Sequence, residues 1–200
     1  MSAAQAAEVS SLDRVEVTAQ RRQESVQDVG VAISVLSGNE LAARGISSVN
    51  KLQNELLSLE IEPAFGSGQP QFRIRGIGFQ DYGSNNSSAV GIYVDEVAFG
   101  FPVQTQGLLF DLERVEVLRG PQGTLYGKNT TGGAINLLTR KPTKETEAGV
   151  SLSFGSFNAK AAQGYVSGSL SDSLRGRFSA ATEQGGAWQS NRLTGEKLGD

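Results

Sequence analysis

Cysteine and histidine are both absent from the 200 residues of this chain. Zinc sites of the Cys/His kind, Ser-His-Asp and Cys-His catalytic groups and disulfide bonds each require one of these residues, so all of them are excluded. The remaining acid/base candidates are the carboxylates Asp95, Glu96, Asp111, Glu113 and Glu116. Each lies near an arginine or in a predicted strand, where such groups are more often solvated or ion-paired. We therefore expect no catalytic residue, no metal and no cofactor.

Excess basic charge and long apolar runs are also missing. The chain has 18 Lys and Arg against 21 Asp and Glu, a net charge of -3, without a basic stripe. This balance argues against nucleic acid as a partner. The longest apolar stretches, residues 29–38 and 89–101, are interrupted and shorter than the roughly 18 residues that a membrane-spanning helix requires. A helical membrane protein is therefore excluded.

Nucleotide-binding loops fail on spacing. The glycine-rich run around Lys128 has Gln122 where a Walker sequence requires its first glycine, and Asn129 follows the lysine instead of Ser or Thr. Gly76-Ile77-Gly78 has Asp81 where the dinucleotide fingerprint requires a third glycine. We expect no nucleotide site.

Glycine is abundant, with 25 residues, and it separates segments of strand-like and helix-like pattern. Ser37 and Glu40 form a capping-box pattern, which predicts a short helix through about Arg44 that Gly45 ends. A second short helix is predicted near residues 48–56. Strands are predicted at residues 31–36, 58–63, 71–78, 90–99, 113–120 and 133–139. Together these segments predict a compact mixed domain with unusually long loops.

The pattern changes after Pro142. Residues 147–157, 161–170 and 174–184 form three segments of about ten residues, in which apolar and polar side chains alternate. Their length suits strands that cross a bilayer at a tilt, with one apolar and one polar face. Taken alone, the same pattern also fits a half-buried sheet of a soluble protein.

Four segments read together carry a family resemblance. They are DRVEVTAQRRQESVQDV (13–29), PQFRIRGIG (70–78), VGIYVDEV (90–97) and DLERVEVLRGPQGTLYGKNTTGGAINLLTRKP (111–142). In this order and spacing they resemble the N-terminal plug of a TonB-dependent outer-membrane receptor. The resemblance implies a flexible arm (1–25) and an α+β plug domain (26–142), a small mixed sheet with short helices and long loops. The first antiparallel strands of a transmembrane β-barrel follow (143–200), and the barrel is incomplete here.

The resemblance also implies a function. Such a receptor lies in the outer membrane of a Gram-negative cell, with its plug in the barrel lumen facing the periplasm. It binds a scarce, bulky nutrient at the cell surface and imports it with energy from TonB. A ferric siderophore is the expected ligand, while sugars, haem and cobalamin stay open. The alternative is a stand-alone periplasmic plug-like module for binding or signalling.

Site residues follow from the resemblance. Val15, Glu16, Val17, Thr18 and Ala19 resemble the TonB box, an exposed alternating strand on a mobile arm that adds to the sheet edge of a partner. An ordinary edge strand of the plug is the alternative.

Two arginines and the glycine-rich run complete the set. Arg75 and Arg119 resemble the plug arginines that meet barrel glutamates and lock the plug; the alternative is a surface ion pair with Glu116 or Asp111. Loops at Phe79 to Ser88 and Phe99 to Gln106 are the candidate ligand-binding loops. Turns and close backbone approaches are expected at Gly120, Gly123, Gly127, Gly132 and Gly133.

Overall fold

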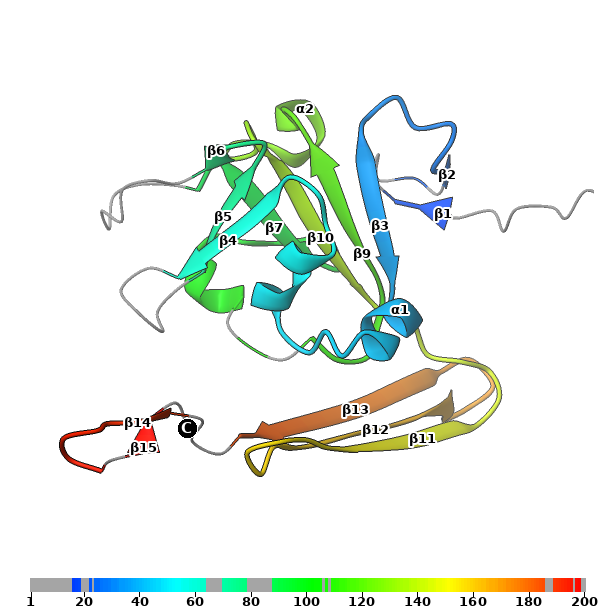
Figure 1. The fold of residues 1–200 in the computed structure, drawn as a ribbon. Helices are drawn as coiled ribbons and strands as arrows, with labels where there is room; N and C mark the ends of the chain where they lie inside the picture. Colours follow the sequence, from blue (N-terminus) through cyan, green and yellow to red (C-terminus); the bar gives the residue numbers. More distant parts are fainter. Residues whose placement is uncertain are drawn as a thin grey trace, which may run out of the picture.

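The computed structural model of the chain describes most of its length. The described residues are 16–18, 22, 24–63, 70–78, 88–105, 107, 109–185, 189–195 and 197–198. Two parts stand out in Figure 1: an α+β region (residues 24–142) and a strand region (residues 147–184), which lies beneath it in this view. None of the helices in these described residues is long and apolar enough to cross a membrane.

A five-stranded mixed sheet organises the α+β region. Its order is β3 (Ile33–Ser37), β9 (Leu112–Arg119), β10 (Gly133–Thr139), β7 (Val90–Val94) and β8 (Val97–Phe99). Neighbours run antiparallel except β10 and β7, which are parallel. A parallel pair requires a long crossover connection, and the chain between β7 and β10 supplies one that includes β9 itself.

Side-chain alternation gives this sheet two different faces. Along β10, Ile135 and Leu137 enter the main hydrophobic core, whereas Ala134 and Asn136 point to the other face. A second antiparallel sheet covers the core face, formed by β4 (Leu59–Pro63), β5 (Pro70–Ile74) and β6 (Ile77–Gly78). Its Phe72 and Ile74 are almost fully buried in that core.

In the described part of the chain four short helical segments connect the strands, and the Ser37 capping box is present. The helix α1 (Gly38–Ala43) begins after Ser37, whose side chain and backbone exchange hydrogen bonds with Glu40. The Ser37 backbone N–H, followed by its hydroxyl, lowers the pKa of Glu40. The other segments are η1 (Val49–Asn54), η2 (Pro102–Thr105) and α2 (Gly123–Tyr126). The sequence pattern did not predict α2, because this helix of 4 residues lies within a glycine-rich run.

Most of the five predicted glycine positions are required by the backbone. Gly133 is the clearest, because it combines a φ of 149° with a close approach: a Cβ there would lie 2.2 Å from the carbonyl oxygen of Leu118. Gly132 similarly abuts the carbonyl of Ile77, while Gly120 and Gly127 have positive φ. Gly123 meets neither condition, so the expectation was wrong at that position.

The strand region is an antiparallel sheet of β11 (Glu147–Phe154), β12 (Lys160–Ser169) and β13 (Arg175–Gln184). A two-stranded pair, β14 (Gln189–Ser190) with β15 (Lys197–Leu198), follows. The register places the large aliphatic and phenylalanine side chains of the three long strands on one face, where Val150 is 81% and Phe178 is 70% exposed. The polar face carries Arg177 and points toward the α+β region.

That exposed apolar face leads to a testable expectation. In detergent-free solution the amides of β11 to β13 should exchange rapidly or the chain should aggregate, because open strand edges and an uncovered apolar face favour association. Detergent micelles should restore slow exchange by covering the face. Hydrogen exchange read by mass spectrometry, with and without detergent, measures this. Equally slow exchange in a detergent-free monomer would contradict a membrane-facing role.

Candidate functional site

The predicted N-terminal coupling strand lies against the α+β region. Its described part is β1 (Glu16–Val17), which pairs antiparallel with β2 (Glu24–Ser25), and Thr18 follows. Val17 is fully buried in the smaller hydrophobic cluster, on the sheet face opposite the main core. The expectation of an exposed strand was therefore wrong for Val17, because its side chain finds an apolar site on the sheet. Val15 and Ala19 lie outside the described residues.

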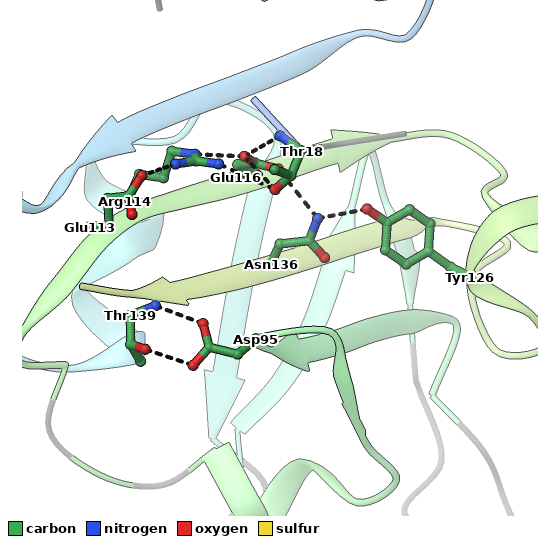
Figure 2. A network of polar contacts seen from close by, with 8 residues as sticks. All are labelled: Thr18, Asp95, Glu113, Arg114, Glu116, Tyr126, Asn136 and Thr139. Carbon is green, nitrogen blue, oxygen red and sulfur yellow. Dashed lines mark hydrogen bonds and ion pairs between the residues drawn. The ribbon is translucent and has the colours of Figure 1, made fainter. Parts of the chain in front are cut away.

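Glu116 is the centre of the contacts under this strand, as Figure 2 shows. The Thr18 backbone N–H donates to Glu116 Oε1 at 2.8 Å, and Arg114 Nε donates to the same oxygen at 2.7 Å. Arg114 also donates from Nη2 to Thr18 Oγ1 at 3.2 Å, and it pairs with Glu113. Glu116 is completely buried, so its charge is stabilised by these donors and not by bulk water.

Asn136 extends the network along β10. Its Nδ2 donates to Tyr126 Oη at 2.7 Å and to Glu116 Oε2 at 3.4 Å (Figure 2). Tyr93 Oη donates to the carbonyl of Tyr126 at 2.6 Å. Within the described part of the chain, Asn136 Oδ1 has no hydrogen-bond partner. A cavity of about 20 Å³, which Thr18, Tyr126 and Asn136 help to line, lies beside it. The surface under the strand thus combines this polar network, next to Thr18, with the apolar site that holds Val17.

Sequence reasoning treated Glu116 only as a solvated or ion-paired group and missed this network. A signal was present, because Arg114 and Glu116 are separated by two positions in a strand and therefore share one face. Two opposite charges on one strand face that also carries Leu118 indicate a buried polar contact. The predicted alternative of Arg119 pairing with Glu116 is wrong, since Arg114 supplies that cation.

The two predicted lock arginines lie at one end of the sheet. Arg75 occupies the turn between β5 and β6 with a φ of 53° and is exposed. Arg119 ends β9 and donates from Nη2 to Ser34 Oγ, and its Nε has no partner among the described residues. The close approach of Gly132 to Ile77 brings the β5–β6 turn against this end. The strand region contacts a different side of the α+β region (Figure 1), so it does not supply partners for this pair.

An ion pair between Arg177 and Asp111 joins the strand region to the α+β region. Arg177 on β13 makes two hydrogen bonds to Asp111: Nε donates to Oδ2 at 2.7 Å, and Nη2 donates to Oδ1 at 2.5 Å. Arg177 also lies over the Tyr165 ring, 4.1 Å from its centroid. The alternative in which Asp111 pairs with Arg119 is therefore wrong. A weaker contact joins Lys51 to Glu183 at 4.0 Å.

Asp111 gives this contact a predictable pH dependence. Burial alone would raise the pKa of Asp111, but hydrogen bonds from Arg177 and Ser179 outweigh it and lower the pKa below the ordinary 3.8. A carboxyl with a lowered folded pKa stabilises the fold above its unfolded value and loses that contribution as the pH falls through the folded value. Below about pH 3.8 the contact between the two regions should therefore weaken.

Replacing Asp111 with Asn tests this expectation. The variant should lower Tm at pH 7 by about 2–4 °C, the shift that about 1 kcal/mol produces in a chain of this size, and should lose part of the acid-induced fall in Tm. Thermal unfolding in detergent across pH 2.5–7, as a rough working range around the carboxyl pKa values, measures both. Lys51→Gln is the matched control, because its exposed contact with Glu183 should contribute little. A fall in Tm at acid pH as large as that of the unchanged protein would contradict a role for Asp111.

A cavity of about 500 Å³ lies between the two regions, next to this ion pair. Phe99, Gln104 and Thr105 line it, so the described part of the candidate loop Phe99 to Gln106 faces the cavity. Gln106 and residues 79–87 of the other candidate loop lie outside the described residues. The described residues contain no group of three or more His, Cys, Asp or Glu placed to hold a metal ion.

These features were compared with known proteins. A family model described as the TonB-dependent Receptor Plug Domain matches residues 25–134. The chain belongs to this family. The α+β region is its plug, and the predicted fold class is confirmed. Family membership places the chain in the outer membrane, with the plug inside a barrel.

Individual relatives support the assignment. The pesticin receptor of Yersinia enterocolitica is 34% identical over 168 residues, which cover 82% of this chain and 22% of that protein. The vitamin B12 transporter BtuB of Vibrio vulnificus is 26% identical over 192 residues, 94% of this chain and 30% of its own. The crystal structure of the ferric yersiniabactin uptake receptor FyuA from Yersinia pestis superposes with a TM-score of 0.74 at 31% identity. The superposed region covers 84% of this chain and 27% of the FyuA chain.

The plug and strand region therefore span about a quarter of the length of these relatives. All three are named as receptors or transporters.

Proposed function

We propose that the protein containing this plug is a TonB-dependent transporter that imports a ferric siderophore across the outer membrane. The observation that carries the proposal is the arrangement of the two regions. The plug contacts the polar face of β11 to β13 through Asp111 and Arg177, and the apolar face of the same strands points outward. A plug inside a barrel wall requires this orientation, because lipid contacts one side of the wall and the lumen the other.

The same arrangement disfavours a stand-alone periplasmic module. Such a module would hold Val150, Phe154 and Phe178 in water, at exposed fractions of 70% or more. A contiguous apolar face of this kind favours association or membrane contact. A stand-alone module would therefore need something else to cover this apolar face.

A siderophore is the preferred ligand because of the relatives. The relative with a solved structure at 31% identity is a ferric yersiniabactin uptake receptor, and further structural neighbours bind pyoverdine. Cobalamin is the second candidate, favoured by the vitamin B12 transporter at 26% identity. Candidate ligand contacts are the loops Phe79 to Ser88 and Phe99 to Gln106, the second of which borders the 500 Å³ cavity.

Coupling and gating are assigned to two sets of residues. Val15 to Ala19 would bind TonB by strand addition, in which main-chain hydrogen bonds provide the affinity. Arg75 and Arg119 would hold the plug to glutamates of the barrel wall, since a charge pair in a hydrated lumen fixes position yet can be broken. Their placement at one end of the sheet supports a joint role.

Uptake by whole cells tests the function. Cells that lack their own siderophore and cobalamin receptors would carry the full-length gene and be given a radiolabelled ferric siderophore or cobalamin. Energised uptake of the siderophore, abolished by a protonophore and by loss of TonB, is the expected result. Uptake of cobalamin alone would identify cobalamin, and not a siderophore, as the substrate, and would leave the TonB-dependent mechanism standing. Uptake that ignores both the protonophore and TonB would refute the proposal.

A further inference from the structure

We propose that Glu116 is a positioning residue that holds the N-terminal strand in its docked place on the plug. The identity of the strand's partner rests on the function proposed above, but the docking contact itself does not. The contact joins residues 98 positions apart, and it is made by a carboxylate with no exposed surface.

All of the groups around the Glu116 carboxylate are donors. Oε1 accepts from the Thr18 backbone N–H, from Thr18 Oγ1 at 3.3 Å and from Arg114 Nε, and Oε2 accepts from Asn136 Nδ2. A buried carboxylate is stable only when such donors surround it. The strand therefore contributes two of the hydrogen bonds that the charge requires, and its departure leaves Glu116 with fewer partners.

The sheet pairing that helps to hold the strand is short, two residues of β1 against two of β2. Val17 is the one apolar side chain among its described residues that is buried. The surface around the Glu116 contact is polar and borders a cavity with room for about one water molecule. Loss of the Glu116 contact should consequently release the strand without unfolding the plug core, as expected for a local opening.

The docked strand is closed to a partner. Its Thr18 N–H is already donated to Glu116 and its Val17 side chain is buried, whereas strand addition needs free main-chain groups along the strand. Docking and partner binding are therefore alternatives. A partner that binds only the released strand sees an affinity reduced by the fraction of molecules that are released. Glu116 sets that fraction.

The chain offers a matched control in the same sheet. Asp95 Oδ1 accepts from the Thr139 backbone N–H at 2.9 Å and Oδ2 accepts from Thr139 Oγ1 at 2.7 Å. This is the same type of contact as that of Glu116 with Thr18, and Figure 2 shows both. Both hydrogen bonds join β10 to the β7–β8 turn and neither involves the N-terminal strand, although Asp95 also lines the cavity beside Thr18. Asp95→Asn thus removes a carboxylate with the same backbone-and-hydroxyl pairing and leaves the hydrogen bonds between Glu116 and Thr18 in place.

Amide exchange in the full chain, held in detergent micelles, gives the direct test. Glu116→Gln should speed exchange of the Thr18 amide by about tenfold or more, the loss expected for a hydrogen bond to a charged acceptor. The amides of Val115, Val117 and Ile135 should keep their slow exchange. Asp95→Asn should speed exchange at Thr139 and leave Thr18 unchanged.

Defined outcomes overturn the proposal. Unchanged exchange at Thr18 in Glu116→Gln would do so, and so would an equal increase in Asp95→Asn, which would indicate general loosening. If Glu116→Gln unfolds the core, Thr18→Val decides instead. That variant keeps the Glu116–Arg114 pair but removes the hydroxyl contacts to both residues, so exchange of the amide at position 18 should rise several-fold. No rise in that variant would overturn the proposal.

A second measurement separates this inference from the proposed function. The C-terminal domain of TonB should bind the Glu116→Gln chain about tenfold more tightly than the unchanged chain, because more of it is released. Release of the strand without any gain in TonB affinity supports the docking role of Glu116. The same result counts against TonB as the partner of Val15 to Ala19.

Discussion

Uptake should fall to the level of cells lacking the receptor when Val17 is replaced with proline, while ligand binding at the cell surface stays near normal. Proline removes a backbone donor from the strand and resists sheet addition, so a partner cannot pair with it. Phe99, Gln104 and Thr105 of the second candidate loop line the cavity beside Asp111, so the substitution should leave their contacts unchanged. Uptake, surface binding and crosslinking to TonB, all measured on the same cells, check the prediction.

Val17→Ala is the control for this experiment. Because Val17 is fully buried on the plug, proline also removes a packing contact, and alanine removes that contact while keeping the backbone N–H. We expect Val17→Ala to retain uptake. Normal uptake by Val17→Pro would remove the coupling role from this strand. Loss of surface binding together with uptake would instead show that the strand belongs to the structural part of the plug.

A large increase in the entry of antibiotics too big for porins is expected when Arg75 and Arg119 are both replaced with Ala in the full-length receptor. If the two arginines hold the plug to the barrel wall, their loss leaves the plug loosely seated in a lumen wide enough to leak. The fold of the plug itself should change little. Arg75 is exposed, and the side chain of Arg119 donates only to Ser34 among the described residues, so the isolated plug should lose less than about 1.5 kcal/mol.

Arg44→Ala is the matched control, because Arg44 forms an ion pair with Glu55 inside the plug. It should leave antibiotic entry at the level of the unchanged receptor. Antibiotic sensitivity of whole cells and urea unfolding of the isolated plug provide the two readouts. Unchanged entry together with a large loss of plug stability would identify Arg75 and Arg119 as internal structural arginines.

The two attachments of the plug differ in kind. The N-terminal strand is held by Glu116 and Val17 on one sheet face. The barrel wall is held by Asp111 and Arg177, whose side chains are only 12% and 6% exposed, with Tyr165 against the guanidinium. The wall contact is bidentate and stacked, which makes it the more rigid of the two. A force on the arm should therefore release the strand before it disturbs the wall contact.

Local pattern was enough to predict most of the elements. Strand-like runs marked β3, β9 and β10, and glycine and turn residues marked their ends. The capping box of Ser37 and Glu40 located α1 within a residue or two. These features depend on neighbours in the chain, so the amino-acid sequence carries them directly. The apolar outer face of the strand region is of the same type.

The partners of the charged and buried side chains could be identified only from the tertiary structure. Thr18 meets Glu116 across 98 positions and Arg177 meets Asp111 across 66, and both pairings depend on which strands become neighbours. Alternation shows that Arg114 and Glu116 share a face, but only the sheet order brings the N-terminal strand onto that face. The amino-acid sequence by itself determined most of the elements, the family and the apolar faces. The burial of Val17 and the partners of Glu116 and Asp111 were decided by long-range packing, because contacts between distant segments have no local period.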